Sequence, residues 1–352
     1  MKFRRKFTIL FLIFMVLNLT ACTNAETDDS SISAQTTVSG ELSAWTAYWD
    51  IDEGIKEISK ITDKLSSISA FALYFNADGS LYVPEKISEK YSSISDITSK
   101  NNVNLYTCVV NDVMEPDGTT VQKDSNIIRK LLSSPQERAR HINDLVSYAQ
   151  NNGYFGIEID YEKLDDDVWP YFTVFCQELH NECVVKKLDM RVILEPKAPV
   201  DRYTLPDGPE YIMMAYNLYG LSTEAGPKAD VDFIKALAEK MNNVSGKKWF
   251  AFATGGFDWE TGGEVTGITE VEALDLINVY SCIPARDEKS GCLYFYYTDS
   301  DGKDHTVWYA DNVTFDLWIK TAKECGYSNI YLWKLGGNMV ETLKQMKENF
   351  IK

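Results

Sequence analysis

The sequence is poor in histidine, in paired cysteine motifs and in basic clusters, and each shortage excludes a class of protein. Its 352 residues include three scattered histidines, His141, His180 and His305, and no HExxH motif. A zinc site is therefore not expected. The seven cysteines form no CxxC pair. The formal net charge is -17 and no basic patch stands out, so nucleic acid is not expected as a partner.

The one long apolar run lies at the N-terminus. Residues 7–19 follow four basic residues and lead into Leu19-Thr20-Ala21-Cys22. The run is too short to span a bilayer comfortably, and a small residue before cysteine resembles the bacterial lipobox, whose cysteine is lipidated. We expect residues 1–22 to be a lipoprotein signal peptide with Cys22 as the lipidation site. An ordinary signal peptide with a chance cysteine is the alternative.

The rest of the chain divides into a tether and a domain. Residues 23–40 are small and polar and indicate a flexible tether. The sequence is 45% hydrophobic and 12% aromatic, so residues 41–352 should form a globular domain. We expect a monomer on the extracellular face of a bacterial membrane, attached only through its lipid anchor. Cys282 and Cys292 flank a loop-like stretch. They could form a disulfide, and two isolated thiols are the alternative.

Strand-like and helix-like segments alternate along this domain. Apolar, β-branched and aromatic runs cover residues 43–49, 67–75, 103–110, 154–161, 188–196, 210–220, 247–257 and 329–337. Helical spacing occurs over residues 127–153, 168–183, 229–243, 312–326 and 339–350. Strands that alternate with helices favour parallel pairing with the helices outside, and eight such strands close into a (β/α)8 TIM barrel of the α/β class. An open doubly wound sheet, or two of them, is the alternative.

One segment breaks the alternation. Residues 258–311 lie between the seventh strand and its helix, and contain a hairpin pattern with a turn at residues 299–302. We expect a small α+β or hairpin insertion that forms one wall of a groove at the top of the barrel.

Three acids occupy alternate positions of the fourth strand, in "FGIEIDYE". Side chains of a strand point alternately to opposite faces, so Glu158, Asp160 and Glu162 should share the lumen face while residues 155, 157, 159 and 161 pack under the helices. Three close carboxyl groups cannot all ionise easily, so at least one should hold a proton near neutral pH. A protonated carboxyl group at the barrel mouth suits a general acid. The alternative without a catalytic role is an edge strand whose acidic side chains face water.

The same stretch resembles the DGxDxDxE signature of glycoside hydrolase family 18, the chitinases and endo-β-N-acetylglucosaminidases. Gly156 matches the glycine, Asp160 the middle aspartate and Glu162 the general acid. Phe155 stands in place of the first aspartate, and Glu158 replaces the deepest one. The resemblance covers almost all of the expected domain, from about Trp45 to Leu343, and is closest to the spore-cortex-hydrolase branch.

Other segments extend the resemblance. Tyr216, in "MMAYNLYG", matches the tyrosine that hydrogen-bonds the acetamido group of the substrate, and Asn217 replaces the usual aspartate. Trp333, in "YLWKLGG", matches the tryptophan beneath the cleaved sugar. We assign Trp333, Asn217, Trp45 and Tyr48 to substrate binding. Taken singly, a tryptophan or tyrosine at such a place is as readily a core residue.

The resemblance implies hydrolysis of β-1,4 bonds after N-acetylglucosamine, in chitin, peptidoglycan or N-glycans, without metal or organic cofactor. The acetamido oxygen of the substrate would attack its own anomeric carbon, in the substrate-assisted route. Glu162 would protonate the leaving oxygen, Asp160 would bind the acetamido N–H, and Glu158 would share a proton with Asp160. A lectin that has lost hydrolysis is the alternative, and a two-lobed solute-binding lipoprotein is a third function.

Overall fold

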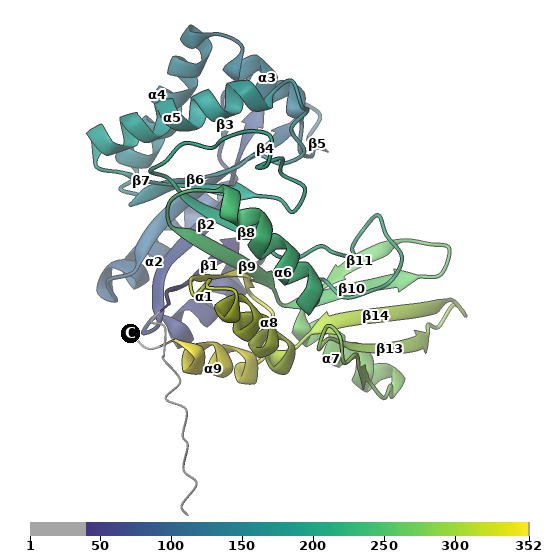
Figure 1. Cartoon of the computed structure of the whole chain (residues 1–352). Coiled ribbons are helices and arrows are strands. Elements are labelled where there is room, and N and C mark those ends of the chain that lie inside the picture. Colours follow the sequence, from purple (N-terminus) through teal and green to yellow (C-terminus); the bar gives the residue numbers. More distant parts are fainter. Residues whose placement is uncertain (1–39, 351–352) are drawn as a thin grey trace, which may run out of the picture. The chain divides into compact units, whose positions relative to one another are not determined.

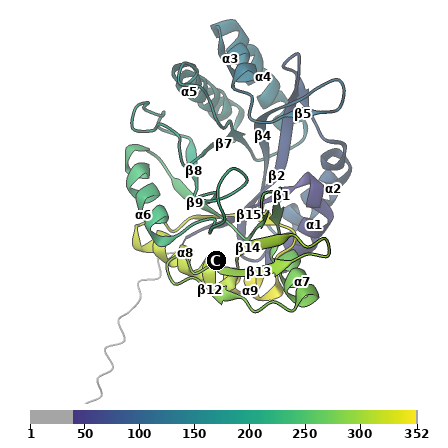
Figure 2. The same cartoon turned by 90° about the vertical axis from the view of Figure 1, so that its right-hand side faces the viewer.

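Eight parallel strands form a closed barrel in the computed structural model of the protein, which describes residues 40–350. In barrel order the strands are β1 (Leu42–Ala47), β2 (Leu65–Asn76), β4 (Asn104–Met114), β6 (Gly156–Asp160), β7 (Asp189–Leu194), β8 (Glu210–Met214), β9 (Lys248–Ala253) and β15 (Ile330–Leu335). The ring closes because β1 pairs in parallel with both β15 and β2 (Figure 2). The barrel prediction is confirmed, and the open-sheet alternative is excluded.

Helices surround the barrel (Figure 1). They are α1 (Ile51–Ile61), α2 (Glu85–Lys100), α3 (Ser125–Leu132), α4 (Pro135–Asn151), α5 (Trp169–Lys186), α6 (Val231–Lys240), α8 (Asn312–Glu324) and α9 (Val340–Asn349). The connection between β7 and β8, residues 195–209, contains no helix. Two short strands, β3 (Leu81–Tyr82) and β5 (Thr120–Val121), extend the sheet beside β2 and β4.

The predicted helix over residues 127–153 is two helices. Pro135 begins α4, where its missing N–H costs no hydrogen bond, and the Ser134 side chain caps the helix by accepting from the Glu137 N–H. Inside a continuous helix the proline would remove a hydrogen bond and clash with the preceding turn. The chain therefore turns at Ser133–Ser134.

A second sheet occupies the connection between β9 and α8. Its strands are β10 (Gly255–Glu260), β11 (Val265–Ile268), β12 (Ala285–Arg286), β13 (Leu293–Thr298) and β14 (Asp304–Ala310), and they pair antiparallel. The hairpin β13–β14 turns at residues 299–302, and α7 (Glu270–Tyr280) packs on this sheet. Figure 1 shows the sheet projecting from one side of the barrel.

The barrel strands separate two apolar cores. The outward side chains, such as Ile157 and Ile159, join the large cluster under the helices. The inward side chains form a smaller cluster in the lumen that includes Trp45, Trp249 and Tyr331. The lumen is thus a packed core with its open end at the carboxyl ends of the strands, where barrel enzymes place their sites.

The cysteines of the described domain are free thiols, Cys282 and Cys292 included, so the disulfide alternative is wrong for this structure. No helix within residues 40–350 is long and apolar enough to cross a membrane. The predicted signal peptide, the lipidation site Cys22 and the tether up to residue 39 lie outside the described residues.

Candidate active site

Strand β6 points Glu158 and Asp160 into the lumen, because its isoleucines pack outward under the helices, and Gly156 lets the strand pass close to its neighbours. A Cβ on Gly156 would lie 2.6 Å from both the Asp189 carbonyl oxygen and the Tyr106 ring, so only glycine fits there. Phe155, just before the strand, is 45% exposed and contacts the Tyr106 ring. The expectation that Phe155 packs under the helices is therefore wrong, because it precedes the strand at the opposite end of the barrel.

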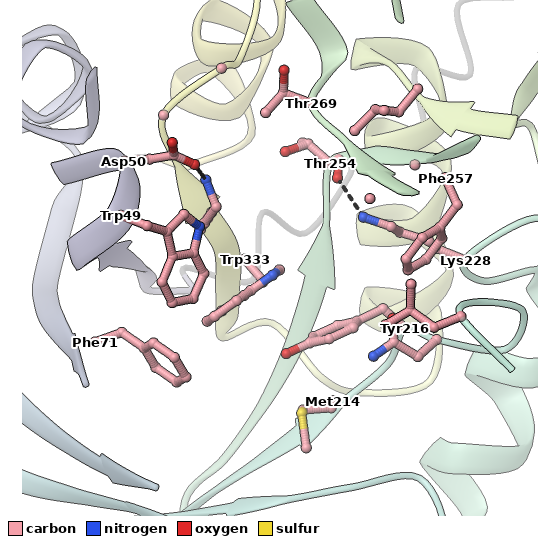
Figure 3. A pocket seen from close by; sticks show the side chains of 18 of the residues that line it. Trp49, Asp50, Phe71, Met214, Tyr216, Lys228, Thr254, Phe257, Thr269 and Trp333 are labelled. Atoms are coloured by element: carbon pink, nitrogen blue, oxygen red, sulfur yellow. Dashed lines mark hydrogen bonds and ion pairs between the residues drawn. The ribbon is translucent and has the colours of Figure 1, made fainter. Parts of the chain in front are cut away.

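The carboxyl ends of the barrel strands border a cleft of about 610 Å³. It brings together five of the predicted residues from three different strands or their ends, namely Asp160, Glu162, Tyr216, Asn217 and Trp333. Figure 3 shows the Trp333 ring in this cleft between Tyr216 on one side and Trp49 and Phe71 on the other. The second sheet and the start of α7 contribute one wall through Phe257 in β10 and Thr269, which precedes α7.

Glu162 is held from two sides. Its backbone N–H donates to Asn111 Oδ1 at 2.9 Å, and its carbonyl oxygen accepts from Asn111 Nδ2 at 2.9 Å. Its carboxylate accepts from Lys123 Nζ at 2.5 Å. Burial raises the pKa of Glu162, and the Lys123 ammonium opposes that shift. Glu162 can therefore carry a proton nearer to neutral pH than an exposed glutamate, as a general acid requires.

Asp160 lies deeper, and one of its oxygens has no partner. The residue is 5% exposed, and Oδ1 accepts no hydrogen bond within the described domain. Burial first, and then the Glu162 charge, raise the pKa of Asp160 well above its usual range. A buried polar atom without a partner is costly. It suits an oxygen that accepts a hydrogen bond from a ligand.

Tyr216 and Trp333 form the aromatic side of the cleft. Burial, with the charges of Asp160 and Glu162 adding to it, raises the pKa of Tyr216, so its phenol stays a hydrogen-bond donor. The Trp333 ring lies nearly parallel to Tyr216 at 6.5 Å and meets the Phe71 ring edge-on at 4.7 Å. Asn217 lines the cleft in a left-handed backbone conformation, with φ 64°. A sugar ring can stack on such an aromatic surface.

Glu158 is placed differently from the prediction. It is fully buried beneath the cleft and outside its lining. It accepts from Trp45 Nε1 at 2.8 Å and from the Tyr331 hydroxyl at 2.6 Å, and it faces Arg191 at 3.4 Å. No hydrogen bond joins Glu158 to Asp160 in the described part of the chain. The shared proton is therefore not found, because the longer glutamate side chain meets other donors deeper in the barrel.

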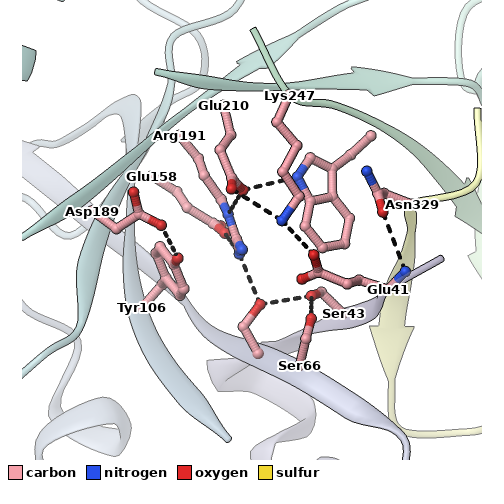
Figure 4. Close-up of polar contacts among 12 residues, drawn as sticks. Glu41, Ser43, Ser66, Tyr106, Glu158, Asp189, Arg191, Glu210, Lys247 and Asn329 are labelled. Carbon is pink, nitrogen blue, oxygen red and sulfur yellow. Dashed lines mark hydrogen bonds and ion pairs between the residues drawn. The ribbon is translucent and has the colours of Figure 1, made fainter. Parts of the chain in front are cut away.

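Arg191 organises the charges beneath the cleft (Figure 4). Its guanidinium bonds Glu210 at 2.9 Å and Ser67 at 2.7 Å, and lies 3.9 Å above the Tyr106 ring. Arg191 is 2% exposed. Glu158 thus serves the interior of the barrel as one anion of a buried network.

Two residues assigned to substrate binding, Trp45 and Tyr48, lie outside the lining of the cleft. Trp45 is 1% exposed and stacks on Tyr331, so it does not line the cleft. Tyr48 packs edge-on against Trp49 and Tyr74 and is also absent from the lining. Trp45 points into the packed lumen from within β1, and only after Ala47 does a 3-10 turn end the alternation of side chains. Trp49, 44% exposed, reaches the cleft instead.

Several cleft residues carry no signal in the sequence. Asp112 lies in strand β4 beside Asn111, which bonds the Glu162 backbone without lining the cleft, whereas Lys123 and Lys228 come from loops. Lys334 pairs with Asp50 across the cleft floor. Only the position after a predicted strand could have pointed to Asn111 and Asp112.

No family model matches the chain. Two relatives from Bacillus subtilis (strain 168) are similar to it. The "uncharacterized glycosylase YvbX" is 23% identical over 240 residues, which cover 64% of this chain and 70% of that protein. A "cortical fragment-lytic enzyme" is 23% identical over 247 residues, 63% of this chain and 56% of that protein. The match to the second thus spans little more than half of its length.

Solved structures share the architecture. The spore cortex-lytic enzyme SleL of Bacillus cereus superimposes with a TM-score of 0.76 at 18% identity, covering 89% of this chain and 74% of that one. A chitinase from Chromobacterium violaceum gives 0.74 at 18% identity, covering 88% and 98%. The barrel fold is the same. At such identities the likeness establishes the fold alone.

Proposed function

We propose that the protein is a glycoside hydrolase that cleaves β-1,4 bonds after N-acetylglucosamine, with the acetamido group of the substrate as nucleophile. One observation carries the proposal: Asp160, Glu162, Tyr216 and Trp333 line a single cleft at the carboxyl end of the barrel. The names of the similar proteins, a glycosylase, a cortex-lytic enzyme and a chitinase, support it.

The first step needs a proton donor for the leaving oxygen and a hydrogen-bond acceptor for the acetamido N–H. Glu162 would protonate the leaving glycosidic oxygen while the acetamido oxygen attacks the anomeric carbon. The free Oδ1 of Asp160 would accept the acetamido N–H, and the Tyr216 hydroxyl would donate to the acetamido oxygen. Trp333 would support the sugar ring from below. In the second step the Glu162 carboxylate would deprotonate a water molecule, which attacks the anomeric carbon, breaks the bond from that carbon to the acetamido oxygen and so restores the acetamido group.

Carbohydrate binding without hydrolysis is the second candidate function. Two observations favour it. Glu158 is engaged with Arg191 and does not assist Asp160, and Lys123 occupies a carboxylate oxygen of Glu162. Such a protein would retain a glycan but release no reducing ends.

The test uses three substrates: chito-oligosaccharides, purified cell wall and a high-mannose glycoprotein. We expect new reducing ends from at least one of them, and about a hundredfold to ten-thousandfold loss of that activity in Glu162→Gln. Glu348→Gln, on helix α9 and 57% exposed, is the matched control and should act like the wild type. Retention of the glycans with no release by the wild-type protein would favour the binding role.

We further propose that the protein is anchored to the outer face of the membrane through Cys22. The support is the sequence pattern alone. Metabolic labelling with a radioactive fatty acid should mark the wild type and not Cys22→Ala. Equal labelling of both proteins would contradict the anchor.

A further inference from the structure

Lys228 lies in the wall of the cleft with part of its hydrogen-bonding capacity unused. It sits in the loop between β8 and α6, and its Nζ donates to the Thr254 carbonyl oxygen at 3.0 Å. The ammonium also lies 5.1 Å from the centre of the Phe257 ring, and Figure 3 shows both neighbours. An ammonium has three donors. Two donors of Lys228 therefore have no hydrogen-bond acceptor within residues 40–350.

The ammonium is fixed close to the cleft floor. Thr254, which accepts from Lys228, donates its backbone N–H to the Trp333 carbonyl oxygen at 3.1 Å. The Thr254 hydroxyl bonds Asn338 at 2.5 Å, just beyond the same strand. The cation thus stands beside the backbone that carries Trp333, on which the sugar is proposed to stack.

Lys228 differs from the other lysines of the cleft. Lys123 pairs with Glu162, and Lys334 pairs with Asp50. Lys228 has no ion-pair partner among the described residues. Burial, with Lys334 adding to it, lowers the pKa of Lys228 to about 8, while Cys292 nearby opposes the shift. A shielded charge without a counter-charge is costly, and a ligand anion would relieve that cost.

We propose that Lys228 binds a carboxylate on the glycan, so that the cleft prefers chains in which an N-acetylated amino sugar carries an acidic substituent. The inference rests on the proposed function, because it assumes that the glycan lies on Trp333. The Phe257 face stabilises the cation without neutralising it. The two remaining donors of Lys228 supply charge-assisted hydrogen bonds, which are stronger than neutral ones.

The test compares one glycan in two forms. The first is a peptide-free chain of alternating N-acetylglucosamine and N-acetylmuramic acid, whose lactyl groups carry free carboxylates. The second is the same chain with these carboxyl groups reduced to alcohols. Both kcat/KM and Kd are measured for the wild type, Lys228→Gln, Lys228→Arg and the control Lys344→Gln, whose side chain is 76% exposed on α9.

The wild type and Lys344→Gln should prefer the acidic chain by about tenfold or more. Lys228→Gln should lose that preference, and Lys228→Arg should keep most of it. Equal kcat/KM and equal Kd of the wild type for the two chains would overturn the inference. So would an equal loss on both chains in Lys228→Gln, which would show that Lys228 only fastens the loop. Preferential binding of the acidic chain without hydrolysis of either chain or of chito-oligosaccharides would keep the inference and contradict the proposed function.

Discussion

The ammonium of Lys123 lies 2.5 Å from a carboxylate oxygen of Glu162, the proposed general acid. The ion pair favours the charged form of a group that must be protonated to act. Burial pushes the pKa of Glu162 upward and Lys123 pushes it downward. The balance between burial and the Lys123 charge sets the pH range in which Glu162 is protonated and can act as the general acid.

Removing the Lys123 charge should extend activity to higher pH. In Lys123→Met the carboxylate loses its counter-charge, so the pKa of Glu162 rises further and the protonated acid persists. We expect the alkaline limb of the kcat/KM profile to move up by about one pH unit. Lys344→Met should leave the limb in place. A limb that stays in place in Lys123→Met, or moves to lower pH, would contradict the role of this ion pair.

Ionisation of the buried Asp160 carboxyl group should lower the stability of the folded state as the pH rises. Its pKa is higher in the folded state than in the unfolded chain, so the folded state holds more protons between those two values. Stability then falls as the pH rises from the ordinary aspartate range, near 3.8, toward the raised value. Asp160→Asn should remove this loss and raise the free energy of unfolding at neutral pH by about 1 kcal/mol or more, while activity falls.

Urea unfolding at several pH values measures this effect. The control is Asp301→Asn, at an exposed position of the β13–β14 turn, and we expect it to change stability little. The prediction would be contradicted if the free energy of unfolding of the wild type increased with pH through this range and Asp160→Asn gave no gain. Ionised Asp160 would then not destabilise the folded state.

Arg191 should be essential for the barrel interior. Arg191→Met leaves the fully buried Glu158 without its cation, whereas Glu210 keeps Lys247, and the loss should lower the free energy of unfolding by about 3 to 5 kcal/mol. Arg202→Met removes an arginine that pairs with Asp166 at the surface and should cost at most about 1 kcal/mol. Denaturant unfolding of both variants gives the comparison. Equal losses would mean that the buried network does not stabilise the fold.

Asn111 should position Glu162 without touching the substrate. Asn111→Ala removes both hydrogen bonds to the Glu162 backbone, so kcat should fall by up to about a hundredfold while KM changes little. Asn126→Ala, at an exposed position of α3, is the control. A loss in KM alone would assign Asn111 to substrate binding instead.

The alternation of strand-like and helix-like segments predicted the barrel, whereas Tyr216, Asn217 and Trp333 were assigned from the family resemblance alone. Isoleucine at every second position of β6, with acids between, predicted which side chains face the lumen. The prediction failed where alternation stops. Trp45 packs into the lumen from within β1, and the 3-10 turn Tyr48–Asp50 then ends the strand alternation, so the exposed tryptophan is Trp49.

The partners of the acids could not be predicted, because they are distant in sequence. Glu158 meets Arg191 and Tyr331, 33 and 173 residues further along the chain. Lys123 and Lys228 reach the cleft from loops, whose paths depend on tertiary packing. A strand pattern tells which way a carboxylate points, whereas its charge state depends on groups brought in by the whole fold.

The dependence of Glu162→Gln on the leaving group tests the general acid most directly. Aryl glycosides of N,N′-diacetylchitobiose with strongly acidic phenols need no protonation on departure, whereas a sugar leaving group needs it fully. We predict that Glu162→Gln loses at least about a hundredfold in kcat/KM on the oligosaccharide but much less on the dinitrophenyl glycoside. Equal losses on both substrates, or near-wild-type turnover of the oligosaccharide, would contradict the assignment of Glu162.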